Sequence, residues 1–353
     1  MRLLTINPGS TSTKIAVFDD LEPVLVENIQ HTVEELSRFS RVSDQFEYRR
    51  DLVLKALEAN NIPIKFDAVV GRGGLLKPIP GGVYRVNERM LGEMEHPMRN
   101  HACNLGSRIA HDIAQLSGGV PALIADPGVV DELEDVARVS GSPLLPRVTT
   151  WHALNQRAIG RRFAAEHGKR YEDLNLIIAH LGGGISIGAH RHGRCIDVNN
   201  AFDGEGPFSP ERAGSLPPGA LIDLCYSQKF TREQLRKRIS GNAGLAAHLG
   251  TTDVRQIVDN IGKGDKKAEL VLGAMIYQIS KAIGGAAIAL RGNVDALLLT
   301  GGVVYSDYVV SRIRDYVEFL APIFLYPGEN EMLAMAQNGY GALTGTIEVK
   351  EYV

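Results

Sequence analysis

The sequence is poor in the residues that mark secreted and metal-binding proteins. Its three cysteines lie far apart and form no C-x-x-C pair, and its histidines form no H-x-x-x-H or H-E-x-x-H motif. We therefore expect neither a disulfide framework nor a zinc site, and the cysteine usage favours a reducing, cytoplasmic compartment. The cysteines are Cys103, Cys195 and Cys225.

Long apolar runs and an excess of one charge are also missing. Residues 282–290 are apolar, but they contain two glycines and are followed by Arg291, so they are too short to span a membrane. Residues 1–6 are too short for the apolar core of a signal peptide. The formal net charge of -3 comes without a basic stripe. We therefore expect neither a membrane nor a nucleic acid as a partner.

Two common nucleotide-binding motifs are absent as well. Residues 9–14 read Gly-Ser-Thr-Ser-Thr-Lys and lack the glycine that precedes lysine in a Walker A loop. Residues 182–187 lack the third glycine of the Rossmann fingerprint. A phosphate held by this chain would therefore be bound by turn amides and hydroxyls between two strands.

What the sequence does contain is a pattern that occurs twice. Residues 5–18 read as an apolar strand, a turn of glycine and hydroxyl residues, and a second apolar strand, and residues 178–189 repeat this order. Two further pairs of similar segments follow in the same order. They are 66–74 with 294–302, and 120–128 with 321–328. The repeats predict two domains of one plan.

Helical stretches between the strands indicate the α/β class, with each mixed β-sheet flanked by helices. We expect the N-terminal domain to contain residues 1–148 and about 338–353, and the C-terminal domain to contain 149–337. The last helix would thus return to the first domain. The expected helices lie near residues 44–60, 102–116, 153–167, 266–290 and 329–343.

The two hairpins predict two phosphate-holding jaws on either side of a cleft, which is typical of a nucleotide-using phosphotransferase. Ser10, Ser12 and Lys14 alternate, so a strand would place all three on one side. The alternative is an ordinary polar hairpin with a surface lysine. Arg72 ends a predicted buried strand and needs an anionic partner, which is either a protein group or a ligand.

Taken together, these segments resemble the acetate and butyrate kinase family of the sugar kinase, heat-shock chaperone and actin superfamily. Residues 7–14, 71–74 and 204–212 resemble the butyrate branch most closely. The resemblance implies a duplicated actin-like, ribonuclease H-like fold with a cleft between its domains. It also implies a homodimer, or a multiple of dimers, formed through the second domain. The implied reaction is direct, reversible transfer of a phosphoryl group from ATP to butyrate or a similar short acid, with Mg²⁺, giving butyryl phosphate and ADP.

The resemblance also implies roles for individual residues. Arg72 and Arg212 would grip the substrate carboxylate and the transferring phosphoryl group, and His152 would donate a hydrogen bond to that group. Asn7, Asp126 and Glu331 would arrange phosphate and Mg²⁺, with Asn7 and Glu331 nearest the metal. The implied phosphate and nucleotide residues are Ser10, Ser12, Lys14, His180, Gly182, Gly183, Gly184, Asp253, Arg255, Gly301, Gly302 and Val303.

The implied pocket for the acid contains Gly73, Gly74, Trp151 and Pro210. Acetate kinases have bulky valines where this chain has the two glycines. We expect the missing side chains to leave room for a four-carbon tail, with Trp151 as a wall. The alternative is that the glycines serve backbone geometry alone.

Two other functions stay open at this stage. A related kinase could phosphorylate a hydroxyl group, in which case Asp126 would act as the general base. A carboxylate acceptor needs no such base, because it is already ionised at neutral pH. An actin-like filament protein or nucleotide-gated binding module would need the phosphate hairpins but not Arg72, His152 and Arg212.

Overall fold

The repeated hairpins are present in the computed structural model, which describes residues 1–97 and 100–353. Strand β1 (Arg2–Pro8) pairs antiparallel with β2 (Ser12–Asp19), and β7 (Asn175–Leu181) pairs in the same way with β8 (Ile185–Arg191). In both hairpins the strands consist largely of buried apolar residues, and the turn between them is short.

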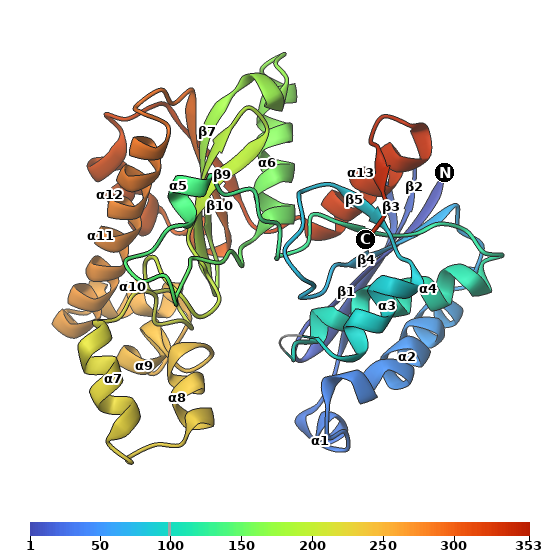
Figure 1. The fold of residues 1–353 in the computed structure, drawn as a ribbon, viewed down its shortest axis with the longest axis horizontal. Coiled ribbons are helices and arrows are strands. Elements are labelled where there is room, and N and C mark those ends of the chain that lie inside the picture. The colour runs from blue at the N-terminus through green and yellow to red at the C-terminus, as the bar shows by residue number, and fades with distance from the viewer. Residues whose placement is uncertain (98–99) are drawn as a thin grey trace. The chain divides into compact units, whose positions relative to one another are not determined.

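Contacts between residues divide the chain into two units (Figure 1). Unit 1 consists of residues 1–130 and 330–353, and unit 2 consists of residues 131–329. The C-terminal helix therefore belongs with the N-terminal part of the chain. The bounds differ from the expected ones, because residues 131–148 join unit 2 and residues 330–337 join unit 1.

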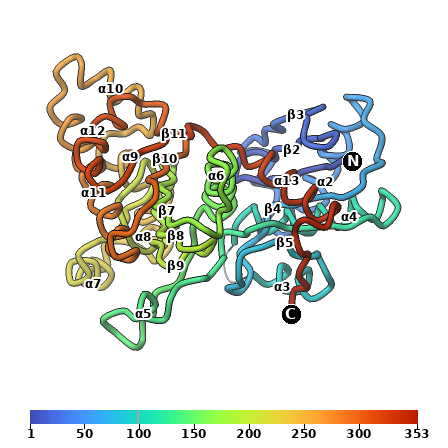
Figure 2. The backbone as a smooth tube through the Cα atoms, turned by 90° about the horizontal axis from the view of Figure 1, so that it is seen from above, coloured from blue at the N-terminus to red at the C-terminus, as the bar shows by residue number. Residues whose placement is uncertain are grey.

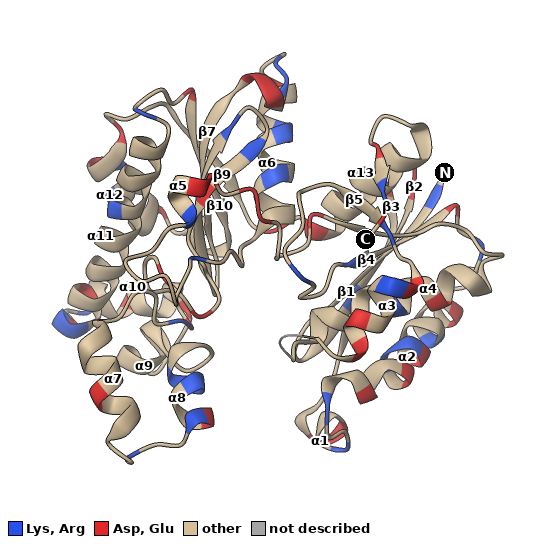
Figure 3. Ribbon diagram, in the orientation of Figure 1, with Lys and Arg blue, Asp and Glu red and all other residues tan. Residues whose placement is uncertain are grey.

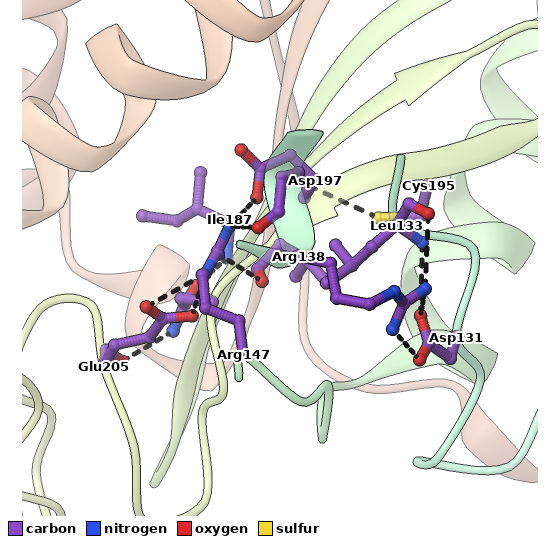
Figure 4. A network of polar contacts seen from close by, with 11 residues as sticks. Asp131, Leu133, Arg138, Arg147, Ile187, Cys195, Asp197 and Glu205 are labelled. Atoms are coloured by element: carbon purple, nitrogen blue, oxygen red, sulfur yellow. Dashed lines mark hydrogen bonds and ion pairs between the residues drawn. The ribbon is translucent and has the colours of Figure 1, made fainter. Parts of the chain in front are cut away.

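Ion pairs explain why residues 131–148 join unit 2 (Figure 4). Arg147 contacts Asp197 and Glu205, each at 2.9 Å. The backbone N–H of Glu134 also donates to the Ile196 carbonyl of unit 2 at 3.0 Å. Leu133 and Arg138 hydrogen-bond to Asp131 within the segment itself. No pattern in residues 131–148 predicts these partners, since Asp197 and Glu205 lie 50 and 58 residues further along the chain than Arg147.

The sheet of unit 1 has seven strands in the order β12-β5-β6-β4-β1-β2-β3. Its central strands β1, β4 and β6 are parallel. Strand β2 runs antiparallel to both of its neighbours, and β5 runs antiparallel to β6 but parallel to β12. The remaining strands of this sheet are β3 (Glu22–Gln30), β4 (Ala68–Arg72), β5 (Val83–Arg85), β6 (Ala122–Ala125) and β12 (Val349–Lys350).

Helices cover both faces of this sheet. Leu4 and Val69 belong to the core that also contains the apolar residues of α2 (Phe46–Ala59) and α4 (Leu105–Leu116). Their neighbours Leu3 and Val70 lie against α13 (Glu331–Thr344), because alternate residues of a strand face opposite ways. The other helices of unit 1 are α1 (Val33–Ser37), α3 (Glu88–Glu95) and two short 3₁₀ turns, Val42–Gln45 and Ala102–Asn104.

The sheet of unit 2 has five strands in the order β11-β10-β7-β8-β9. The directions of neighbouring strands repeat those of β6-β4-β1-β2-β3 in unit 1. Each predicted repeat falls on equivalent strands, so the duplicated plan is confirmed. The strands not yet given are β9 (Arg194–Val198), β10 (Ala296–Gly301) and β11 (Ile323–Pro327).

The sheet of unit 2 lies between α6 (Ala153–Glu166) and α11 (Lys266–Ala289) (Figure 2). The five predicted helices correspond to α2, α4, α6, α11 and α13. The other helices are α5 (Asp135–Arg138), α7 (Pro218–Tyr226), α8 (Arg232–Ile239), α9 (Gly244–Leu249), α10 (Val254–Gly262), α12 (Asp307–Val317) and the 3₁₀ turns Tyr171–Asp173 and Gly302–Tyr305.

Candidate active site

The turn of the first hairpin has its carbonyl groups directed at protein donors. Arg49, on α2, donates to the carbonyls of Gly9 at 2.8 Å, Ser12 at 3.0 Å and Ser10 at 3.3 Å. The backbone N–H of His31 donates to the Thr11 carbonyl at 2.8 Å. Because its carbonyl oxygens accept these hydrogen bonds, the turn is suited to receive an anion on its other side.

Sequence reasoning missed Arg49, although a signal for it existed. Its side chain is only 1% exposed, and burial lowers its pKa to about 10. The buried face of α2 contains Phe46, Arg49, Val53 and Leu57, so a charged residue stands at a position of the apolar stripe. A buried guanidinium at such a position indicates that polar partners lie opposite it.

The predicted alternation of Ser10, Ser12 and Lys14 holds only in part. Ser12 and Lys14 lie in β2 on the face opposite the buried Thr13. Ser10 lies in the exposed turn before that strand begins, so its position does not follow the strand period. Their contact with phosphate remains a prediction.

Arg72, Glu331 and Asn7 form one polar cluster in unit 1. Arg72 is the last residue of β4, is 14% exposed, and forms an ion pair with Glu331 at the start of α13. Asn7, near the end of β1, donates from Nδ2 to Glu331 Oε2 at 2.7 Å. The sequence left the partner of Arg72 open, and here it is a protein carboxylate. The carboxyl ends of adjacent parallel strands are where ligand-binding groups of open α/β sheets gather.

Asp126 follows β6 and is completely buried. Its φ of 38° is in the left-handed region, which few non-glycine residues adopt. It exchanges two hydrogen bonds with Gly82, whose N–H donates to Asp126 Oδ1 at 2.8 Å and whose carbonyl accepts from the Asp126 N–H at 2.9 Å. Backbone strain of this kind clusters at functional sites.

The expectation that Gly73 and Gly74 leave empty space is wrong. A Cβ atom on Gly73 would lie 2.5 Å from Pro127 Cβ, and one on Gly74 would lie 2.9 Å from Asn104 Cα. Both glycines are therefore required by close packing inside unit 1. Trp151 is 3% exposed, and its ring meets that of His190 edge-on within unit 2.

Two stacked imidazoles lie at the start of α6 in unit 2. The rings of His152 and His180 are 3.8 Å apart and inclined by only 12°. His180 is completely buried, with Nδ1 2.8 Å from Asn155 Oδ1 and Nε2 3.0 Å from Glu329 Oε1. His152 Nδ1 lies 2.9 Å from Ser186 Oγ. The stack fixes the plane of both rings.

The second hairpin turn needs its glycines for close approach. A Cβ atom on Gly182 would lie 2.8 Å from Glu329 Oε1, and one on Gly184 would overlap the guanidinium of Arg212. That guanidinium donates to the Ala201 carbonyl and lies over the ring of Phe202. Burial lowers the pKa of Arg212, and the carboxylates of Glu211 and Asp203 oppose this shift.

A cavity of about 780 Å³ opens beside this turn, wholly within unit 2. Its volume lies in the range of nucleotide and drug-sized pockets. Gly183 and the segments around Asp253 and Gly302 line it, whereas Gly184, His180 and Gly301 do not. The complete lining is Gly182, Gly183, Pro210, Glu211, Thr252, Asp253, Val254, Arg255, Gly302, Val303, Tyr305, Ser306 and Glu329.

Asp253 and Arg255 differ in what their side chains contact and in how exposed they are. Asp253 caps α10, because its carboxylate accepts from the backbone N–H groups of Arg255 and Gln256. The side chain of Arg255 is 91% exposed. Pro210, expected beside the acid, lines the 780 Å³ cavity together with the predicted nucleotide residues.

Comparison with known proteins places these features in a family. The chain is 65% identical over 352 residues to a protein of Bacteroides thetaiotaomicron named probable butyrate kinase, covering all of both chains. It is 49% identical over 353 residues to butyrate kinase 1 of Clostridium acetobutylicum, covering 99% of each.

Solved structures with low sequence identity share the fold. Porphyromonas gingivalis acetate kinase matches with a TM-score of 0.77 at 20% identity, covering 97% of this chain and 99% of that one. A propionate kinase from Francisella tularensis matches with a TM-score of 0.76 at 18% identity, covering 96% and 98%. These matches confirm the expected actin-like ATPase fold. A model of the acetokinase family matches residues 147–330, and together with the full-length relatives this shows that the chain belongs to the acetokinase family.

Proposed function

We propose that this protein is a butyrate kinase, which reversibly transfers a phosphoryl group from ATP to butyrate or a similar short acid. The observation that carries the proposal is its 47–65% identity, over nearly the whole chain, to six relatives named butyrate kinase or probable butyrate kinase. The products are butyryl phosphate and ADP.

The chemistry of the site supports this reaction. Phosphoryl transfer passes through a loose transition state, so positioning and charge stabilisation matter more than a base. Arg72 and Arg212 supply positive charge for the carboxylate and the phosphoryl oxygens, and His152 supplies a hydrogen bond. Asp126 is held by Gly82 in a fixed orientation, which suits it to position water or the metal ion.

Mg²⁺ enters this proposal together with ATP. Among residues 1–97 and 100–353, no three His, Cys, Asp or Glu side chains gather so as to hold a metal ion by themselves. Mg²⁺ usually combines one or two protein oxygen ligands with substrate phosphates and water. The oxygens of Asn7 and Glu331 fit that need, and the ion would neutralise phosphate charge.

The cavity of unit 2 is the proposed nucleotide site, with Gly182 and Gly183 at the phosphates and Asp253, Arg255, Gly302 and Val303 on the adenosine side. Ser10, Ser12 and Lys14 would contact phosphate from unit 1. We further propose that the enzyme is cytoplasmic and assembles as a homodimer, or a multiple of dimers, through unit 2.

Trapping the acyl phosphate with hydroxylamine tests the reaction directly. Wild-type enzyme with MgATP should yield hydroxamate from butyrate, with acetate, propionate and isobutyrate defining the acid preference. Arg72→Ala should lower kcat/KM roughly 1,000-fold or more, the range seen when an arginine that stabilises this transition state is lost. Arg85→Ala is the control, because Arg85 forms a half-exposed pair with Glu351. Absence of product with every acid would refute the proposal, and ADP release with polyols instead would favour a hydroxyl kinase.

A further inference from the structure

A row of buried polar side chains leads to His152 from the interior of unit 2. Tyr171 Oη lies 2.6 Å from His190 Nδ1, and His190 Nε2 lies 2.8 Å from Gln156 Oε1. Gln156 Nε2 lies 2.8 Å from Ser186 Oγ, which lies 2.9 Å from His152 Nδ1. The first four residues are at most 3% exposed. None of them was predicted from the sequence as functional.

The orientation of Gln156 sets the direction of these hydrogen bonds. Its Nε2 also lies 3.0 Å from the backbone carbonyl of Ser186, which can only accept. The amide nitrogen therefore faces Ser186, and the amide oxygen faces His190. Because that oxygen can only accept, His190 Nε2 carries a proton.

His190 is a neutral imidazole, so its other nitrogen is an acceptor. Burial lowers the pKa of His190 to about 3, and the charge of Arg157 adds to the effect. Burial also raises the pKa of the Tyr171 phenol, which stays protonated. Tyr171 therefore donates to His190 Nδ1, and His190 donates from Nε2 to Gln156.

The orientation of Gln156 also sets the direction of the hydrogen bond between Ser186 and His152. Ser186 Oγ accepts from Gln156, so its single proton is directed to His152 Nδ1. We infer that Tyr171, His190, Gln156 and Ser186 are positioning residues that hold His152 in the tautomer with its proton on Nε2. The inference rests on the proposed function, in which His152 donates to the transferring phosphoryl group from that nitrogen.

Gly188 keeps room for this arrangement. A Cβ atom there would lie 2.6 Å from Gln156 Oε1 and 2.8 Å from His190 Nε2, so only glycine permits their hydrogen bond. The stack on His180 fixes the ring plane of His152 at the outer end of the row. The row thus specifies both the orientation of His152 and the place of its proton.

The test is nuclear magnetic resonance of the full-length enzyme with ¹⁵N-labelled histidine, at mildly alkaline pH where an ordinary imidazole is neutral. His152→Gln identifies the His152 signals. We expect the wild-type ring to be protonated at Nε2 and unprotonated at Nδ1. Gln156→Glu replaces the two donors by an acceptor, so the Ser186 hydroxyl should turn away and His152 should take a proton at Nδ1.

The variants should lower kcat but leave both KM values unchanged. The expected loss is roughly tenfold for Gln156→Glu and for Ser186→Ala, the effect of about one hydrogen bond. Tyr326→Phe is the matched control, because it removes a hydrogen bond to Glu166 elsewhere in unit 2. It should alter neither the His152 signals nor kcat.

Two results would overturn the inference. One is a wild-type His152 protonated at Nδ1, which needs no variant to fold. The other is an unchanged His152 signal in folded Ser186→Ala or Gln156→Glu enzyme. Because the spectra require no substrate, the outcome is independent of the acid assay that tests the proposed function.

Discussion

Arg49 is a buried cation that donates hydrogen bonds to neutral acceptors. Its guanidinium reaches three carbonyls of the first turn, the hydroxyl of Thr13 and the side chain of Gln45. Such a residue shapes the turn and also places positive charge behind it. Both effects favour a phosphate on the other side of the turn.

Replacing Arg49 should therefore weaken folding and nucleotide binding together. For Arg49→Met we expect the free energy of unfolding to fall by about 3 kcal/mol, because hydrogen bonds to a charged group contribute about 1.5–3 kcal/mol. The KM for ATP should rise. Arg50→Met is the control, because the Arg50 side chain pairs with Asp51 and Asp112 near the surface, where such pairs contribute about 0–1 kcal/mol. Equal losses in both variants, measured by urea unfolding, would contradict this role.

His31 should make stability depend on pH. Burial, and secondarily Arg49, lowers its pKa in the folded protein from 6.5 to about 4. The unfolded chain thus takes up this proton at higher pH, so the stability from this histidine is complete above 6.5 and is lost as pH falls towards 4. His31→Gln should reduce the slope of unfolding free energy in that window by up to about 1.4 kcal/mol per pH unit. Parallel curves of unfolding free energy against pH for the wild type and His31→Gln would contradict this role of His31.

At the level of residues, sequence patterns predicted the candidate site residues that stand in recognisable segments. Arg72 ends a readable strand, and Asp126 follows one. Arg49 could have been found from its place on the apolar stripe of α2, but its partners, the turn carbonyls, could not. Ser186 did not stand out, because its importance depends on a partner distant in the sequence, the ring of His152. Likewise the packing around Gly74 comes from Asn104, a residue of another segment.

At the level of elements, the strand ends organise both units. Asn7 lies near the end of β1 and Arg72 ends β4, while His180 lies near the end of β7 and Gly301 ends β10. Apolar strand patterns and their repetition sufficed to predict this order. The boundary between the units was harder to predict. The ion pairs of Arg147 and the interactions of Glu331 determine it, and no change in linker composition marks it.

The packing of Gly74 beside the end of β4 leads to a prediction about acid preference. Gly74→Val should lower stability by about 1–3 kcal/mol, the usual cost of overpacking, with no shift towards shorter acids. Gly74→Ala and Gly92→Ala form a matched pair, since a Cβ on Gly92 of α3 meets nothing within 4 Å. Gly92→Ala should stabilise by up to about 1 kcal/mol. A stable Gly74→Val enzyme that prefers acetate would restore the empty-space explanation.

At the scale of the whole molecule, charged side chains are spread over both units, whereas large exposed aromatic side chains among the described residues belong to unit 2. Lys and Arg are interspersed with Asp and Glu over both units (Figure 3). The large exposed aromatic residues among residues 1–97 and 100–353 all belong to unit 2, and they are Tyr226, Tyr277, Tyr305, Tyr316 and Phe319. Aromatic residues are enriched at protein interfaces.

Helix α11 has exposed apolar residues along one side. It is apolar and long enough to count as a candidate membrane span by length and composition, and half of its most apolar window is buried in unit 2. Leu270, Tyr277 and Ile288 are exposed at spacings that place them on one side, and a Cβ on Gly284 would meet nothing within 4 Å. Tyr277 also contacts Tyr316 of α12.

We therefore expect the proposed dimer to form through this face of α11. Sedimentation velocity should give wild-type protein a mass of twice 38.3 kDa, or an even multiple. Tyr277→Glu and Ile288→Glu should each weaken association by on the order of 100-fold, because an unpaired charge buried in an interface costs several kcal/mol. Val26→Glu, at an exposed apolar position in unit 1, should leave the mass unchanged. A dimer that survives both substitutions would show that the interface lies away from α11. A monomeric wild type would contradict the proposed dimer itself.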